Sequence, residues 1–392
     1  MQTLGGPETF TAEPYVAVHP EDTGIIAVGA NRIGAYVGTP SLPPSTSSGP
    51  GLTYGLFITE DHGRTWRTPA IPTVPGSIHL GDPSIEFDAR GTLHVTGLMR
   101  YPDANRSGIF HVSTPDLGES WSPVRELSDD RGGDRQWLSI DGDRVFVAWQ
   151  VSSIPATFVA RSNDRGASWE PVSVIEACNL NSEVVVVGDR ALLACTDGTD
   201  GSEATRITDV SRHDQPMELA RLPVQYGYKR LTNLPDAAIA LTTSGNDPDG
   251  ATVFVRTSSD GGSSWNDAFN AGAASILMDG WSWSWISWAT ADPDGRIHVL
   301  ATGGTGDQCV RGACDDERAG RQHVHLIVDA SAELLLHEAL VSPADPGSGG
   351  RGYESAWPGL GDEASGIACH AKGCVLAWGW GKAIDWTTIT WS

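Results

Sequence analysis

The sequence predicts an all-β chain of seven four-stranded antiparallel blades, a β-propeller, and three observations lead to this fold. A short pattern, Ser/Thr-x-Asp-x-Gly-x-Ser/Thr-Trp, occurs four times, and a hairpin of two short strands occurs seven times. No segment carries a helical period over a useful length. With 392 residues and 40% hydrophobic content, the chain can bury the large core that such a fold requires.

The four copies of the short pattern read TEDHGRTW, TPDLGESW, SNDRGASW and SSDGGSSW, and they centre on Asp61, Asp116, Asp164 and Asp260. The last interval is twice the one before it, so we expect a blade without the pattern between the third and fourth copies. The Asp carboxylate can accept backbone N–H bonds two residues on, and the Gly can take a positive φ. The Trp then covers the turn with a large apolar surface. These features predict a structural role for the four Asp residues.

The seven hairpins define the blades. They read YVAVHPEDTGIIAVGA, SIEFDARGTLHVTGL, WLSIDGDRVFVAWQ, EVVVVGDRALLACT, LTNLPDAAIALTT, ISWATADPDGRIHVLAT and SGIACHAKGCVLAWG. We expect one β-propeller domain over residues 1–392, with blades at about 13–72, 80–128, 135–176, 178–224, 228–270, 281–343 and 353–392. The last unit ends on its third strand, so residues 1–12 are expected to supply its outer strand and close the propeller. Six blades are the alternative.

Four matches at blade spacing resemble the Asp-box, or bacterial neuraminidase repeat, propellers of the sialidase-like superfamily. The resemblance covers nearly the whole chain and implies the fold more strongly than an activity, since one fold serves many functions. It also implies that the boxes lie on the face opposite the usual ligand site. A sialidase carries its first arginine in an Arg-Ile-Pro motif, and here the matching place reads AEPYVAV, with Glu13 and no arginine. Sialidases also have six blades, so both departures count against sialidase activity.

The six cysteines form three close pairs in the sequence, which we expect to be disulfides: Cys178 with Cys195, Cys309 with Cys314, and Cys369 with Cys374. The two cysteines of the last pair flank a His-Ala-Lys-Gly turn and would face each other across a hairpin. Free buried thiols or a metal site are the alternatives, but the spacings are not those of zinc sites. Because disulfides persist outside the cytosol, we expect a secreted or periplasmic protein from which a signal peptide has been removed.

The net charge of the chain limits the classes of partner that it can bind. The net charge of −23 disfavours nucleic acid and anionic membranes, and no apolar run is long enough to span a membrane. We therefore expect a carbohydrate or polysaccharide ligand, a monomer, and no cofactor. A structural calcium ion is the alternative for the acidic loops TDGTDG and NDPDG, although neither matches the ligand spacing of an EF-hand.

The candidate site residues lie in the loops that lead into the first strand of each blade and those that join its second and third strands. The candidates for catalysis are His79, Asp82, Tyr228, Tyr353 and Glu354. The candidates for substrate binding are Arg100, Arg135, Trp137, Arg230, Trp281, Trp283 and Trp357. The tryptophans would stack on sugar rings or, alternatively, pack between blades.

These residue types suit two chemistries. A hydrolase would use two carboxylates such as Asp82 and Glu354, and a lyase would use His79 and Tyr228 for proton transfer with Arg230 neutralising a uronate. The loops differ from blade to blade, so one glycan-directed site at the mouth of the propeller is favoured over seven equivalent ones. The alternative to a polysaccharide-cleaving enzyme is a non-catalytic module that binds a glycan or a protein.

Overall fold

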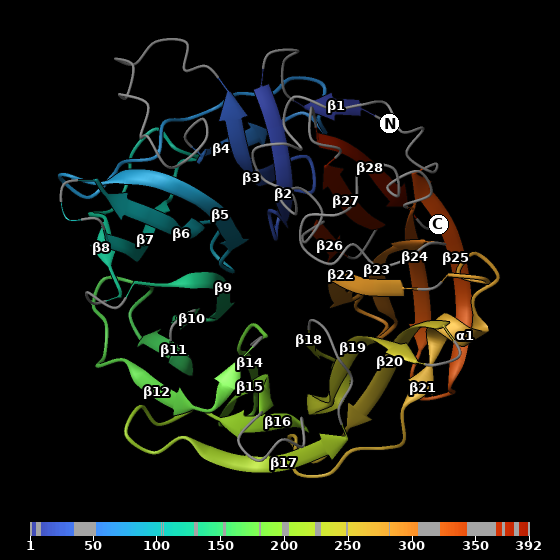
Figure 1. The fold of residues 1–392 in the computed structure, drawn as a ribbon. Helices are drawn as coiled ribbons and strands as arrows, with labels where there is room; N and C mark the ends of the chain where they lie inside the picture. Colours follow the sequence, from blue (N-terminus) through green and yellow to red (C-terminus); the bar gives the residue numbers. More distant parts are fainter. Residues whose placement is uncertain are drawn as a thin grey trace. The chain divides into compact units, whose positions relative to one another are not determined.

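The structure is a computed structural model. It describes residues 2–4, 9–34, 52–102, 104, 106–128, 132–151, 154–179, 182–197, 204–223, 229–247, 250–281, 283–304, 322–342, 366–370, 373–379 and 384–390. The chain divides into two compact units, one of residues 1–145, 162–169 and 349–392 and the other of residues 146–161 and 170–348. Almost every described element is a strand (Figure 1).

The first unit contains three complete sheets and the first strand of a fourth. One sheet contains β26 (Gly366–His370), β27 (Gly373–Gly379), β28 (Ile384–Thr390) and β1 (Gln2–Leu4). The next contains β2 (Thr9–Val18), β3 (Ile26–Gly34) and β4 (Leu52–Thr59). The third contains β5 (Ile78–Phe87), β6 (Leu93–Tyr101), β7 (Arg106–Thr114) and β8 (Arg125–Glu126), and β9 (Asp134–Asp141) follows it.

The second unit continues the same order. The sheet that β9 begins is completed by β10 (Arg144–Val151), β11 (Ile154–Ser162) and β12 (Ser173–Glu176). The next contains β13 (Cys178–Asn179), β14 (Val185–Val187), β15 (Arg190–Asp197), β16 (Ala204–Asp209) and β17 (Met217–Pro223). Two further sheets contain β18 (Lys229–Asn233), β19 (Ile239–Asp247), β20 (Gly250–Ser258) and β21 (Phe269–Asn270), then β22 (Trp283–Ala291), β23 (Ile297–Gly304), β24 (Gln322–Asp329) and β25 (Leu334–Ser342).

Seven antiparallel sheets in chain order confirm the predicted fold class, and the six-blade alternative is wrong. The predicted closure is also confirmed, because β1 pairs with β28 through Gln2 and Trp386. Among the described residues of the first blade, the outer strand is represented by an isolated bridge between Ile58 and Arg67. The described helices are α1 (Ala271–Ala274) and a 3-10 turn (Pro235–Ala237), and neither could span a membrane.

The second strands of the blades are buried on both faces and contribute much of the core. All eight residues of β23 are buried, and the first seven of β6 are buried. Such continuous burial fits the lack of regular polar–apolar alternation in these strands, since a strand covered on both sides gains nothing from alternation, and their polar residues His94 and His298 are buried as well.

The four repeated patterns form one hydrogen-bonded turn, here called the Asp turn. In the third copy, the hydroxyl of Ser162 donates to Oδ1 of Asp164 at 2.8 Å. Both Asp164 oxygens also accept from Ser168, one from its N–H and one from its hydroxyl. The same bonds recur in the turns centred on Asp61, Asp116 and Asp260. The hydrogen bonds lower the pKa of Asp164 to about 2, so the turn is held by a carboxylate at neutral pH.

The Gly of each Asp turn docks on the preceding blade. A Cβ atom on Gly166 would lie 2.4 Å from Cε1 of His111, and one on Gly63 would lie 2.1 Å from the ring of Trp386. Gly118 meets Pro69 and Gly262 meets Leu192 in the same way. The Gly therefore supplies both a positive φ and a close approach between blades.

The fourth and sixth blades keep only part of this turn. Asp209 accepts from the N–H and hydroxyl of Ser211, and Asp329 accepts from the N–H and hydroxyl of Ser331. In the sixth blade Ser331 stands in the place of the docking Gly. Leu334, in the place of the Trp, is 51% exposed.

Candidate functional site

Asp82 lies on an irregular segment of β5. The pairing of β5 with β6 shifts register twice, between His79 and Gly81 and between Gly81 and Ser84. Asp82 has φ 52°, which is the left-handed region that residues with a Cβ avoid. Since the Asp turn lies at the far end of β7, which runs in the same direction as β5, Asp82 lies towards the opposite end of the blade. Bulges and strained residues of this kind are concentrated at functional sites.

Two buried amides hold Asp82 in place. The Nδ2 atom of Asn31, on β3, donates to Oδ1 of Asp82 at 2.8 Å, and the Asp82 N–H donates back to the Asn31 oxygen. The side chain of Gln136, on β9, donates to the Asp82 carbonyl. Asn31 and Gln136 are each 1% exposed, while Asp82 is partly exposed. The two neighbouring blades therefore hold Asp82, the first through its carboxylate and N–H and the third through its backbone carbonyl.

Arg135 repeats the unusual backbone of Asp82 at the start of β9. Its φ is also 52°, and its N–H donates to Oδ1 of Asp134 at 2.9 Å. The Arg135 side chain is partly exposed, whereas Trp137 is only 5% exposed and its ring lies 5.9 Å from that of Tyr15. Of these two predicted substrate contacts, Arg135 is accessible and Trp137 packs in the core of the unit.

His79 packs inside the second blade. Its ring centroid lies 5.0 Å from that of Phe110, and Nε2 lies 3.2 Å from the carbonyl of Ile71. Burial lowers the pKa of His79 to about 4, so the ring is neutral at physiological pH. Arg100, opposite Ile78 in the register of β5 and β6, is partly exposed at the same end of the blade as Asp82.

Tyr101, Glu126 and Arg106 form a polar group that includes the outer strand of the second blade. The Tyr101 hydroxyl donates to Oε2 of Glu126 at 2.6 Å, and Arg106 binds the same carboxylate and lies 3.7 Å above the Tyr101 ring. Burial and the Glu126 carboxylate raise the pKa of Tyr101, which disfavours a phenolate there. Sequence reasoning missed Glu126 because it lies on the two-residue outer strand β8, which no periodicity marks.

The second unit has its own polar cluster at the corresponding end of its strands. Arg230, fully buried, lies 3.3 Å from Oε2 of Glu183 and 4.2 Å above the ring of Trp288. The adjacent Lys229, 1% exposed, donates to the hydroxyl of Thr196 at 2.6 Å. Burial raises the pKa of Glu183 even though Arg230 opposes the shift.

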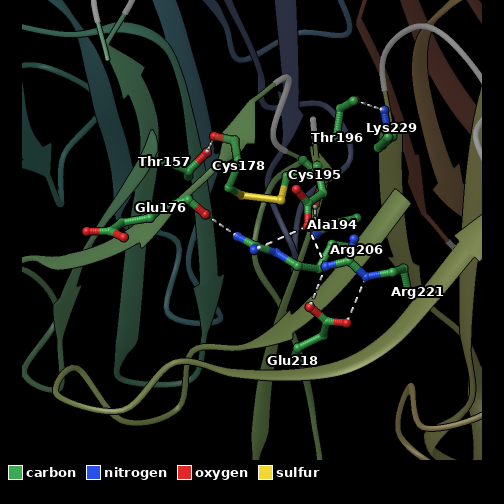
Figure 2. The surroundings of a disulfide bond; sticks show 12 residues. Thr157, Glu176, Cys178, Ala194, Cys195, Thr196, Arg206, Glu218, Arg221 and Lys229 are labelled. Atoms are coloured by element: carbon green, nitrogen blue, oxygen red, sulfur yellow. Dashed lines mark hydrogen bonds and ion pairs between the residues drawn. A yellow bond between two sulfur atoms is a disulfide. The ribbon is translucent and has the colours of Figure 1, made fainter. Parts of the chain in front are cut away.

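The disulfide between Cys178 and Cys195 lies beside a group of charged residues (Figure 2). Arg221 binds both Asp197, at 2.6 Å, and Glu218, at 3.1 Å. Arg206 donates to the carbonyl of Glu176 at 2.7 Å (Figure 2). These contacts lie within this unit, and they tie β15, β16 and β17 to one another and to β12.

The comparisons with known proteins concern the fold. No protein-family model matches the sequence, and no curated protein matches it. A protein of unknown function from Dyadobacter fermentans is 13% identical, with a TM-score of 0.52 over 99% of this chain and 97% of that one. An α-L-arabinofuranosidase from Fusarium graminearum is 10% identical, with a TM-score of 0.51 over 99% of this chain and 98% of that one. The β-propeller domain of the Trilobed protease from Pyrococcus furiosus is 8% identical, with a TM-score of 0.50 over 97% and 94% of the two chains.

The chain has the β-propeller fold. At these identities the likeness shows the fold alone, so an activity has to be argued from the residues of this propeller.

Of the remaining predicted site residues, one lies in the core, one begins a strand and four lie outside the described residues. Trp281 is 4% exposed and packs in a core cluster with Met278 and Ala289. Trp283 begins β22. The candidates Tyr228, Tyr353, Glu354 and Trp357 lie outside the described residues, as does the predicted pair Cys309 and Cys314. The other two predicted disulfides, Cys178–Cys195 and Cys369–Cys374, are present.

Proposed function

We propose that this chain is a secreted Asp-box propeller that binds a carbohydrate at the end of its blades opposite the Asp turns. Asp82 is the central ligand-binding carboxylate. The observation that carries the proposal is the left-handed backbone of Asp82, held by the buried side chains of Asn31 and Gln136. A strained residue persists where its surroundings fix it, and such strain is concentrated at functional sites.

The neighbouring groups have the chemistry that sugar recognition requires. Arg100 and Arg135 are partly exposed, and both belong to the same unit as Asp82. Carboxylates and guanidinium groups bind hydroxyl groups, and a guanidinium also binds the acid group of a uronate. In a chain of net charge −23, two partly exposed arginines in the unit that contains Asp82 favour binding of an acidic glycan over general repulsion.

Cleavage of the glycan would need a second acid or base group beside Asp82. The sequence assigns this role to Glu354, with Tyr228 and Tyr353 as further candidates for proton transfer. Glu354→Gln therefore tests the enzymatic form of the proposal, while Asp82 variants test ligand binding itself.

Export is the second part of the proposal, and the disulfides support it. Both described disulfides link residues close in sequence, and the described residues contain no free cysteine. Disulfides of this kind persist in oxidising compartments.

The decisive experiment is a screen of the purified protein against acidic and neutral polysaccharides. Binding is measured by isothermal titration calorimetry, and cleavage by reducing ends and by the absorbance of unsaturated products. Asp82→Asn keeps a residue that tolerates the left-handed conformation and removes the charge. We therefore expect the affinity to fall by about 10-fold or more without loss of the fold. Asp143→Asn, at an exposed carboxylate on the Asp-turn side of the third blade, is the matched control.

Equal affinity of Asp82→Asn and the wild type for every glycan that binds would remove Asp82 from the site. Cleavage that disappears in Glu354→Gln while binding persists would establish the enzymatic form. Saturable binding with no products would establish a binding module.

A further inference from the structure

The second unit has a cavity of about 510 Å³ on the side of the blades that carries the Asp turns. It lies between the fifth and sixth blades, and its lining includes Trp265, Asn266 and Ser259 from one blade and Asp294, Arg296 and Ser331 from the other. Its volume is within the range of small-molecule sites. It is separate from the polar clusters described above, which lie at the opposite ends of the strands.

The degenerate turn of the sixth blade forms part of the lining of this cavity. Between the first and second blades, Gly118 of the complete Asp turn docks on Pro69. In the sixth blade Ser331 replaces this Gly, is exposed, and hydrogen bonds back to Asp329. Asp329 and Ser331 of this turn both line the cavity, as does Trp265 of the Asp turn in the fifth blade.

Trp265 gives the cavity an aromatic wall. Its Nε1 atom donates to the Gly262 carbonyl at 3.0 Å, so its polar group is satisfied within its own turn. The ring packs against the core cluster of Leu231 and Ile239 and also lines the cavity. An aromatic ring beside fixed polar groups is the arrangement that a sugar ring fits, because sugars have an apolar face and a polar edge.

The polar groups on the other wall are ordered. Arg296 donates to Asp294 at 2.7 Å and to the buried Asp292 at 2.6 Å. Asp294 is 74% exposed, so its carboxylate remains accessible beside a fixed guanidinium. Together with the hydroxyls of Ser259 and Ser331, these groups offer both donors and acceptors to ligand hydroxyls.

The charge of the lining selects the class of sugar. Asp294 and Asp329 line the cavity together with Arg296, which gives a negative excess, and the whole chain carries −23. An acidic sugar would be repelled. We infer that this cavity is a second carbohydrate site, which binds a neutral sugar between Trp265 and the Asp294–Arg296 pair.

A cavity at the corresponding place between the first and second blades provides a comparison. It has a volume of about 420 Å³, contains Glu60, Asp116 and Glu119, and includes none of the four Asp-turn tryptophans. Its lining is acidic and has no indole wall. The aromatic wall therefore distinguishes the cavity between the fifth and sixth blades from the one between the first and second.

Fluorine NMR of the protein labelled with 5-fluorotryptophan tests the inference at the residue that carries it. The signal missing from Trp265→Phe identifies Trp265. Cellotriose, mannotriose and xylotriose are the neutral probes, and trigalacturonate is the acidic one. We expect at least one neutral trisaccharide to shift the Trp265 signal saturably at roughly millimolar concentration, and trigalacturonate to leave it unchanged.

Two variants separate the site from adventitious binding. Ser259→Trp places a large side chain at the exposed rim and should abolish the shift, while Asp294→Ala should weaken binding by about 5-fold or more. Asn163→Trp, at the same position of the third Asp turn, is the matched control and should bind like the wild type. Calorimetry on these variants gives the same comparison if Trp265→Phe folds poorly.

The inference is overturned if no neutral trisaccharide shifts the Trp265 signal at about 20 mM, or if Ser259→Trp binds as tightly as the wild type. The result is independent of the proposed site at Asp82, because Asp82→Asn should leave the shift intact. Loss of the shift in Asp82→Asn with unchanged binding in Ser259→Trp would assign the sugar to the Asp82 site instead.

Discussion

The Nδ1 atom of His94 lies 3.0 Å from Nε2 of His111, and both rings are buried. The Nε2 atom of His94 lies 3.5 Å from Asp88, which completes a buried chain of one carboxylate and two imidazoles. The sixth blade repeats the chain with Asp292, His298 and His325, again with 3.0 Å between the rings. In both blades the sequence of the turn is Asp-x-x-Gly-x-Ile/Leu-His-Val, which places a polar chain at matching positions of two apolar sheets.

These buried imidazoles should make the protein less stable in mild acid. Burial lowers the pKa of His325 to about 3 and that of His79 to about 4, and it lowers the pKa of His111 well below its usual value. Above pH about 6.5 these imidazoles are neutral in both the folded and the unfolded protein. As the pH falls below that value the unfolded chain takes up protons first, so the free energy of unfolding falls as the pH drops from 7 to 5.

Urea unfolding of the wild type and His325→Gln at pH 7 and pH 5 checks this expectation. The variant should lose less free energy over the interval, because it lacks one of the titrating groups. The raised pKa of Glu183 acts in the opposite direction but is common to both proteins. His213→Asn, at an exposed position, should show the pH dependence of the wild type. An equal pH dependence in His325→Gln would contradict the argument.

The docking of the Asp turn can be measured with two glycines. Gly166 has φ 83° and contacts His111, whereas Gly142 has φ 61° and a Cβ there would meet nothing within 4 Å. Gly142→Ala should cost about 1–2 kcal/mol for the left-handed backbone alone. Gly166→Ala should cost at least about 2 kcal/mol more, since the ring of His111 must also move. Urea unfolding gives both values, and equal costs would show that the turn does not need the close approach.

The contrast between these glycines shows what the sequence could predict. The hydrogen bonds of the Asp turn join residues no more than four apart, so a local pattern is sufficient to identify it. The partner of each Gly belongs to the preceding blade, as Gly63 and Trp386 show. No local pattern predicts such a contact, because it depends on how the blades pack.

The same distinction applies to the candidate site. The sequence predicts Asp82 and Arg135 as site residues because it places them where the chain enters a first strand, and the structure places both within those strands, β5 and β9. Asn31 and Gln136 were missed because an amide in a strand becomes significant only when the register brings it to the Asp82 backbone. Trp137 was predicted to contact substrate, but aromatic residues near a strand end serve the core equally well, and it is 5% exposed.

Removing Arg230 should destabilise the protein strongly. Glu183 is buried and forms an ion pair with Arg230, with 3.3 Å between Oε2 and Nη1. Arg230→Met would leave a buried acid without its cation, at a cost of about 3–5 kcal/mol. The double variant Arg230→Met, Glu183→Leu should recover most of the loss, because two apolar side chains replace the pair. Thermal and urea unfolding measure both, and a double variant no more stable than Arg230→Met would refute this.

The two described disulfides should contribute unequally. Cys178 and Cys195 are 17 residues apart, and Cys369 and Cys374 are 5 apart. Closing the longer loop restricts the unfolded chain more, which corresponds to about 3 kcal/mol against about 2 kcal/mol. Replacing both cysteines of each pair by alanine and measuring urea unfolding compares them. A larger loss from the Cys369–Cys374 pair would contradict the loop-length argument.

Two variants of Asp82 separate the effect of the backbone strain on stability from the effect of the carboxylate on binding. Asp82→Gly and Asp82→Ala both delete the side chain that Asn31 holds, but only glycine adopts φ 52° without a steric penalty. We expect Asp82→Ala to be less stable than Asp82→Gly by about 1 kcal/mol, and both to lose glycan binding. Unfolding in urea and calorimetry with the glycan that binds best measure the two effects. If Asp82→Gly bound that glycan as tightly as the wild type, the carboxylate would have no part in recognition and Asp82 would act on the backbone alone.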